Sequence, residues 1–203
     1  MKPFQIIVAE DDKWYAEFLQ YQLSLNPDYQ VTSVHSAREL FKQLTPQTNA
    51  ITLDYSLPDA TGAEVLRRIR TDFPTCQVVV VSGQEDIKTA VSLLKEGAYD
   101  YIVKDEDTKD RLWKTIVNIR ENLSLRKEVE ALREEVGHKY NFSLTIVGQS
   151  KPIQKVFGLL EKAAQSSINV SISGETGTGK EVVAKAIHYH SDRRKSPFVA
   201  INV

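Results

Sequence analysis

Residues 50–54 read Ala50-Ile51-Thr52-Leu53-Asp54, four residues suited to a buried strand followed directly by a carboxylate. In an open parallel sheet, helices cover both faces, so the central strands are continuous apolar runs. Ligands bind at the carboxyl ends of such strands. Taken alone, Asp54 has a simpler explanation, because aspartate is also common as a helix cap and in turns. The rest of the chain decides between these interpretations.

Short apolar runs recur along the first half of the chain, and each is followed by apolar residues at helical spacing. The expected strands are residues 4–9, 29–34, 50–53, 77–81 and 99–103. Strands that alternate with helices in this way predict an α/β fold with a parallel, doubly wound sheet and right-handed crossovers.

The composition is that of an ordinary soluble protein. The 203 residues suffice for one large or two small domains, with 41% apolar and 26% charged residues. A net charge of -1 provides no overall attraction to nucleic acid or membranes, and the single cysteine excludes an internal disulfide. We find no signal peptide and no apolar run near the ~20 residues that span a bilayer, so we expect no membrane association and a cytoplasmic location.

Polar side chains follow four of the five expected strands. They are Glu10, Asp11 and Asp12 after the first strand, Asp54 after the third, Ser82 after the fourth and Lys104 after the fifth. Parallel strands end at the same edge of a sheet, so these groups converge. Clustered carboxylates repel one another, and Mg²⁺ would relieve that repulsion. A carboxylate nucleophile beside a metal ion, a hydroxyl and an ammonium group suits phosphoryl transfer.

Four stretches together resemble the receiver domain of bacterial response regulators: residues 8–12, 53–62, 81–83 and 97–104. The resemblance covers residues 1–120 and implies a five-stranded, flavodoxin-like sheet in the order 2-1-3-4-5. It implies that Asp54 accepts a phosphoryl group from a histidine kinase. It also implies an Mg²⁺ site at Asp54 and the first-strand acids, with Asp11 as a direct ligand and Glu10 or Asp12 assisting through water.

The same resemblance assigns roles to the later strand ends. Ser82 and Tyr101 match the hydroxyl and aromatic pair whose rearrangement reports phosphorylation, and Lys104 matches the lysine that contacts the phosphoryl group. For Tyr101, the simpler alternative is a half-buried tyrosine with a solvated hydroxyl. Asp105 departs from the family, which usually has proline after this lysine. The departure adds a negative charge near the site.

A long helix is predicted from Thr108, with no proline or glycine until Gly137. It carries two offset apolar stripes, Leu112, Ile116, Ile119 and Leu123, then Leu125, Val129, Leu132 and Val136. The first stripe is expected to pack on the receiver sheet. The second has the spacing of a coiled-coil seam, which predicts a parallel homodimer through a helical linker at residues 121–140. A solvated spacer helix is the alternative.

A glycine-rich stretch, Gly174-Glu175-Thr176-Gly177-Thr178-Gly179-Lys180-Glu181, lies between an expected strand at 168–173 and an expected helix. Such a loop binds phosphate with its backbone amides, and Lys180 would reach the terminal phosphates. With residues 146–150, 186–188 and 196–202, it resembles the AAA+ ATPase domain of the NtrC-like sigma-54-dependent activators, in which glutamate after the lysine is usual. The resemblance assigns residues 141–203 to a partial P-loop α/β segment and implies ATP with Mg²⁺. A plain glycine-rich turn is the alternative.

Together the resemblances imply a two-component response regulator that controls sigma-54-dependent transcription. We expect sigma-54 RNA polymerase and DNA to be partners only of a longer parent, because the second acidic nucleotide motif, the arginine finger and a DNA-binding helix-turn-helix are not in this sequence. For the same reason we expect no ATP hydrolysis. Two alternatives stay open: a P-loop ATPase whose receiver regulates assembly, and a phosphate-receiving adaptor without ATPase or DNA-binding output.

Overall fold

The computed structural model describes residues 3–84, 86–139 and 150–201, and it describes the side chains of α5 only as far as residue 133. The chain divides into two compact units, Met1–Ser124 and Leu125–Val203. Each unit is described separately below. No described helix is both long enough and apolar enough to cross a membrane.

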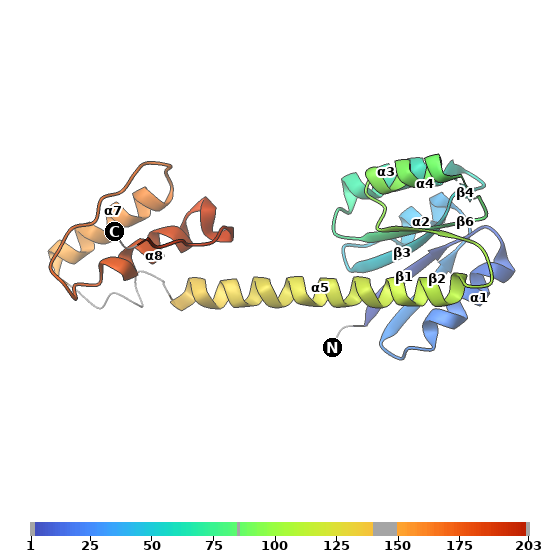
Figure 1. The fold of residues 1–203 in the computed structure, drawn as a ribbon, viewed down its shortest axis with the longest axis horizontal. Coiled ribbons are helices and arrows are strands. Elements are labelled where there is room, and N and C mark those ends of the chain that lie inside the picture. The colour runs from blue at the N-terminus through green and yellow to red at the C-terminus, as the bar shows by residue number, and fades with distance from the viewer. Residues whose placement is uncertain (1–2, 85, 140–149, 202–203) are drawn as a thin grey trace. The chain divides into compact units, whose positions relative to one another are not determined.

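The first unit is built on a five-stranded parallel sheet (Figure 1). Its strands are β1 (Phe4–Ala9), β2 (Tyr29–Val34), β3 (Thr48–Asp54), β6 (Gln77–Ser82) and β7 (Asp100–Val103). Their spatial order is β2-β1-β3-β6-β7, which is 2-1-3-4-5 when only these five are counted. This confirms the predicted α/β fold and strand order. The opening stretch forms the central strand, β3.

Helices cover both faces of the sheet, as continuous apolar strands require. They are α1 (Lys13–Ser24), α2 (Ala37–Gln43), α3 (Gly62–Asp72), α4 (Ile87–Lys95) and α5 (Thr108–Lys139). Along β3, Ile51 and Leu53 join the core formed with α2, α3 and α4, whereas Ala50 joins the core formed with α1 and α5. Alternate residues of one strand thus bury into two different layers.

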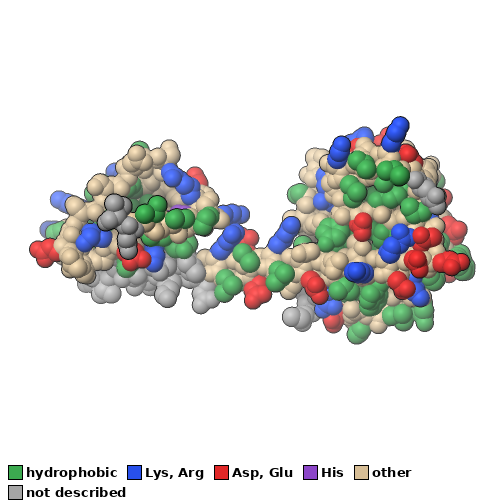
Figure 2. All heavy atoms as spheres, in the orientation of Figure 1, with side chains coloured by type: hydrophobic (Ala, Val, Ile, Leu, Met, Phe, Trp, Pro, Cys, Tyr) green, Lys and Arg blue, Asp and Glu red, His purple; other side chains and the backbone are tan. Residues whose placement is uncertain are grey.

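The two apolar stripes of α5 have different environments. Leu112, Ile116 and Ile119 are buried in the core with α1 and the sheet, and Leu123 packs against it, which confirms the prediction for the first stripe. Leu125, Val129 and Leu132 are 58%, 46% and 53% exposed, and Val136 lies outside the described side chains. Figure 2 shows hydrophobic side chains beside charged ones along the exposed part of α5.

The second unit contains α7 (Lys151–Ala164), α8 (Lys180–His190) and a short 3-10 helix, η1 (Asp192–Lys195). A small core joins α7 to α8 through Leu160 and Ala186. The strand expected over residues 168–173 is not formed: these residues have no regular secondary structure, and Ile168 and Val170 are exposed. The physical reason is that a strand needs a hydrogen-bonded neighbour, and no strand lies among the described residues of this unit.

Candidate functional site

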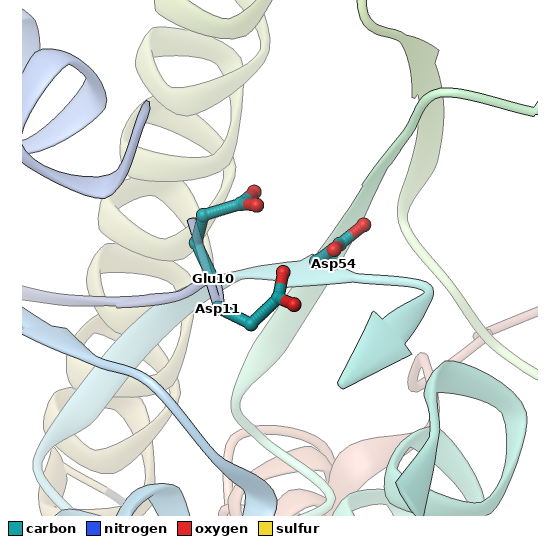
Figure 3. Close-up of side chains that lie close together, drawn as sticks. All are labelled: Glu10, Asp11 and Asp54. Atoms are coloured by element: carbon teal, nitrogen blue, oxygen red, sulfur yellow. The ribbon is translucent and has the colours of Figure 1, made fainter. Parts of the chain in front are cut away.

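Three carboxylates meet at the ends of two neighbouring strands (Figure 3). Glu10 and Asp11 follow β1, and Asp54 ends β3; β1 and β3 are paired through Ala9 and Leu53, so both strands end at the same level. One oxygen from each carboxylate lies within 4.8 Å of the others. Glu10 and Asp54 are only 2% and 6% exposed, whereas Asp11 is exposed. The cluster therefore combines two enclosed charges with one that is open to solvent.

Lys104 brings an ammonium group to this cluster. Its Nζ atom donates to Glu10 Oε1 at 2.8 Å and lies 2.8 Å from Oε2 of the same carboxylate and 3.4 Å from Asp54 Oδ1. The residue follows β7, and its backbone N–H donates to the Ser82 carbonyl at 2.8 Å. One ammonium cannot neutralise three carboxylates, so the site keeps an excess of negative charge.

Burial and pairing act in opposite directions on this ion pair. Burial raises the pKa of Glu10, and the charge of Asp54 adds to the rise, although the hydrogen bond from Lys104 opposes it. Burial by itself lowers the pKa of Lys104, but the hydrogen bond and charge of Glu10, followed by those of Asp54, outweigh it and raise that pKa. Burial dominates for the enclosed carboxyl, whereas pairing dominates for the less enclosed ammonium.

Asp12 has a different position from the other two first-strand acids. It is the N-cap of α1, and its Oδ1 atom accepts hydrogen bonds from the backbone N–H groups of Trp14 at 2.9 Å and Tyr15 at 3.1 Å. Its carboxylate is not in the group formed by Glu10, Asp11 and Asp54. The structure thus uses Asp12 to start the helix that follows the site.

Ser82 and Tyr101 both contact Gln84 in the loop after β6. The Ser82 side chain is buried at the end of that strand, and its Oγ atom accepts a hydrogen bond from Gln84 N at 3.1 Å. The Tyr101 hydroxyl donates to the Gln84 carbonyl oxygen at 2.7 Å. The hydroxyl of Tyr101 is therefore bonded to this loop, and one residue links the two predicted site positions.

The negative charge of Asp105 is paired with a residue other than Lys104. Its carboxylate forms an ion pair with Arg111 on α5, which lowers the pKa of Asp105. Its backbone N–H donates to Thr108 Oγ1 at 2.7 Å, and that buried hydroxyl donates to the Val103 carbonyl at 3.1 Å. These contacts fix the conformation of the loop after Lys104. Position 105 is the one at which the family usually has proline.

The strand-and-helix patterns did not predict the small hairpin after Asp54, formed by β4 (Ser56–Leu57) and β5 (Ala60–Thr61). Asp59 at its turn accepts hydrogen bonds from the backbone N–H groups of Ala37 at 2.8 Å and Arg38 at 2.9 Å, which ties the hairpin to the start of α2. Gly62 follows, and a Cβ atom there would lie 2.8 Å from the Tyr55 Cα atom. The Pro58-Asp59 pair was the available turn signal.

The sequence patterns also did not predict that the aromatic ring of Tyr15 lies at the site. Its centroid lies 4.8 Å from Lys104 Nζ, on the first turn of α1. The sequence carries no local signal for this contact, because the two residues belong to different layers of the first unit.

The glycine-rich loop in the second unit leads directly into α8. Gly177 and Gly179 have φ angles of 85° and 83°, which favour glycine, and Lys180 is the first residue of the helix. Lys180 Nζ donates to the carbonyl oxygens of Gly174 at 2.9 Å and Glu175 at 2.7 Å. A loop of this shape at a helix N-terminus can hold phosphate.

The side chain that departs from the general P-loop pattern, Glu181, pairs with Lys185 one turn along α8 at 2.7 Å. This ion pair lowers the pKa of Glu181. The glutamate therefore has a partner on its own helix.

Comparison with known families gives two matches. Residues 6–116 match the response regulator receiver domain, which is more than half of the chain, and residues 146–203 match the sigma-54 interaction domain.

Two curated relatives align along nearly the whole chain. The DNA-binding transcriptional regulator NtrC of Bradyrhizobium sp. (strain RP501 Parasponia) is 33% identical over 199 residues, which cover 98% of this chain and 40% of that protein. The regulatory protein LuxO of Vibrio cholerae is 34% identical over 184 residues, which cover 90% of this chain and 39% of that protein. The chain thus spans about two fifths of the length of these relatives.

Solved structures agree with this assignment. NtrX from Brucella abortus aligns with a TM-score of 0.59 and 28% identity, covering 98% of this chain and 43% of that one. The same protein in complex with ATP aligns with a TM-score of 0.57 and 29% identity, covering 100% and 43%. The receiver domain of a putative LuxO repressor from Vibrio parahaemolyticus has a TM-score of 0.58 and 25% identity, covering 63% and 98%. The sheet order and both family matches therefore show that the chain belongs to the response regulator family, as an NtrC-like member in which a receiver domain precedes a sigma-54 interaction segment.

Proposed function

We propose that Asp54 accepts a phosphoryl group from a histidine kinase, and that the sigma-54 interaction segment passes this signal to sigma-54-dependent transcription. The observation that carries the proposal is the position of Asp54. Its nearly buried carboxylate ends the central strand, lies beside two further carboxylates and is 3.4 Å from the ammonium of Lys104. A nucleophile held on a rigid strand beside a cation suits attack on an anionic phosphoryl group.

The step is a phosphoryl transfer without a net redox change. A carboxylate oxygen of Asp54 attacks phosphorus, the P–N bond of the kinase phosphohistidine breaks, and its electron pair leaves with the imidazole nitrogen. An acyl phosphate forms on Asp54. Lys104 neutralises charge on the phosphoryl oxygens, and the Ser82 hydroxyl at the next strand end donates to another of them.

The carboxylate cluster fits Mg²⁺, because its three oxygens are hard ligands within 4.8 Å of one another. Asp11 is exposed and Asp54 ends the strand, so we assign these two as direct ligands. Glu10 is engaged by Lys104 and assists through water. Asp12 serves as the helix cap. The bound ion supplies positive charge to the phosphoryl oxygens.

For the second unit we propose ATP binding at residues 174–181. The loop conformation and the ATP-bound NtrX relative support this assignment. Sigma-54 RNA polymerase and DNA are the partners that we propose for a protein as long as the relatives.

We further propose that Leu125, Val129 and Leu132 pair two copies in parallel, because their exposed apolar surface is costly unless covered. We also propose a cytoplasmic location, because the single cysteine fits a reducing compartment.

The decisive experiment is intact-mass analysis after incubation with acetyl phosphate and Mg²⁺. Wild type is expected to gain the mass of one phosphoryl group, and Asp54→Ala is expected to gain none. EDTA should prevent the gain in wild type. A wild-type mass that stays unchanged under every donor and Mg²⁺ condition contradicts the proposal.

The P-loop ATPase alternative shares the nucleotide site with the proposal and stays open. The adaptor alternative concerns the second unit only. Titration with ATP and Mg²⁺ separates it from the proposal: tight binding that is lost in Lys180→Ala supports a nucleotide site. Absence of binding in wild type supports an adaptor whose only phosphate chemistry is at Asp54.

A further inference from the structure

The ring of Tyr15 covers one side of the Lys104 ammonium. The centroid lies 4.8 Å from Nζ, inside the roughly 6 Å range of a cation–π interaction. Glu10 and Asp54 contact the same ammonium at 2.8 Å and 3.4 Å. Two carboxylates and one aromatic face therefore surround the charged end of a side chain that is 23% exposed.

The position of the ring is set by its own helix. The Tyr15 N–H donates to Asp12 Oδ1 at 3.1 Å, which fixes the first turn of α1. The Phe18 ring lies 6.0 Å from the Tyr15 ring and is itself stacked on Trp14 at 6.0 Å with an interplanar angle of 5°. The Tyr15 ring thus lies beside other aromatic rings of its own helix.

The hydroxyl of Tyr15 does not explain its placement. The oxygen is buried, and it has no hydrogen-bond partner of normal geometry among the described residues. Burial raises the pKa of this phenol, and the neighbouring Thr108 hydroxyl opposes the rise. The contact that Tyr15 makes with the Lys104 ammonium is therefore made by its ring, whose centroid lies 4.8 Å from Nζ.

We propose that Tyr15 is a positioning residue for Lys104, holding the ammonium over Asp54 while it transfers from Glu10 to the incoming phosphoryl group. The proposal rests on the phosphoacceptor function of Asp54. To reach phosphoryl oxygens on Asp54, the ammonium must loosen two 2.8 Å contacts with Glu10. The ring attracts the cation without competing as an anion, so the ammonium keeps support throughout that shift.

The first test compares Tyr15→Phe and Tyr15→Leu in the full chain, by the rate of adduct formation with acetyl phosphate at saturating Mg²⁺. Tyr15→Phe keeps the ring and is expected within about twofold of wild type. Tyr15→Leu is expected to be about tenfold slower, the fold-change of a partly enclosed cation–π contact. Equal rates for Tyr15→Leu and wild type overturn the proposal.

A double-mutant cycle separates positioning from general packing. In a Lys104→Ala background, Tyr15→Leu is expected to cause no further slowing, because the group it positions is gone. The same tenfold drop in both backgrounds shows that Tyr15 acts by another route and overturns the proposal.

A third arm needs no phosphorylation. Urea unfolding midpoints of Tyr15→Leu, Lys104→Ala and the double variant should be non-additive if ring and ammonium interact in the folded state. Additive midpoints overturn the proposal. A wild type that takes up no phosphoryl group removes the proposed function, and the unfolding cycle then decides the Tyr15–Lys104 contact by itself.

Discussion

The ammonium of Lys104 lies 2.8 Å from both carboxylate oxygens of Glu10, across 94 positions of sequence. Glu10 is almost fully enclosed, so this contact joins the ends of β1 and β7 through a largely desolvated charge. Loss of one partner from such a pair is costly, because it leaves the other buried and unpaired.

Lys104→Met is therefore expected to lower the free energy of unfolding by about 2 kcal/mol in buffer without Mg²⁺, a value below that of fully buried pairs because the lysine is partly exposed. Adding Glu10→Gln to this variant should recover part of the loss, since the buried charge of Glu10 is then gone, whereas buried Asp54 still lacks its 3.4 Å contact with Lys104. Urea titration of the three variants and wild type measures both effects. An undiminished stability of Lys104→Met would show that Glu10 finds another partner.

Binding of Mg²⁺ should stabilise the receiver unit, because it relieves repulsion among Glu10, Asp11 and Asp54. At a hundredfold excess over Kd, the gain is about 3 kcal/mol, measured as a rise in Tm that EDTA reverses. Asp11→Asn should remove most of this rise. Asp12→Asn is the matched control and should retain it, because asparagine also caps a helix. Loss of the rise in Asp12→Asn would instead assign Asp12 to the metal site.

Proline at position 105 should be less well tolerated than alanine, although related receivers usually carry proline there. The Asp105 N–H donates to Thr108 Oγ1, and proline has no such donor. Asp105→Pro is expected to cost about 1 kcal/mol or more in the free energy of unfolding. Asp105→Ala keeps the N–H and loses the exposed ion pair with Arg111 and the hydrogen bond from the Asp107 N–H to Asp105 Oδ1. Asp105→Pro loses these side-chain contacts as well, so the cost of Asp105→Ala should be smaller. The reverse order in urea unfolding would contradict this account of the loop.

The cap formed by Asp59 should make stability depend on acidic pH. Backbone hydrogen bonds from Arg38 and then Ala37 lower the pKa of Asp59 below its ordinary value of 3.8. The folded state therefore releases this proton more readily than the unfolded state. The stabilisation is present above pH 3.8 and is lost as the pH falls through the lower folded-state pKa.

Asp59→Asn removes this titration but keeps an acceptor. Its stability should be lower than that of wild type at neutral pH and should fall less steeply below about pH 4. Urea midpoints measured across this range provide the comparison. Parallel curves for the two proteins would mean that Asp59 contributes no pH dependence.

The exposed seam on α5 should control association. Val129→Glu places a charge in the row formed with Leu125 and Leu132, and it should weaken dimerisation at least about tenfold. Lys127→Glu alters charge away from the seam and should change it little. Sedimentation equilibrium of the full chain measures both. A wild type that stays monomeric at high concentration identifies this part of α5 as a solvated spacer.

Sequence by itself determined the α/β class and the residues at each strand end, and its resemblance to receiver domains implied the strand order. A run such as Ile51-Thr52-Leu53 is stable only when both faces are covered, and alternation with amphipathic helices leaves few possible topologies. The same local logic predicted the buried face of α5, which is observed.

Tertiary structure alone decided which partners those residues take. Lys104 pairs with Glu10, Asp105 pairs with Arg111, and Asp12 caps a helix. The sequence places all of these carboxylates near the strand ends but does not show which partner each one takes. The ring of Tyr15 reaches Lys104 from another layer, and residues 168–173 form no strand because none lies beside them in the part of the second unit that the structure describes. Periodicity depends on neighbours along the chain, whereas ion pairs, aromatic contacts and strand ladders depend on distances of a few ångströms between segments that only folding brings together.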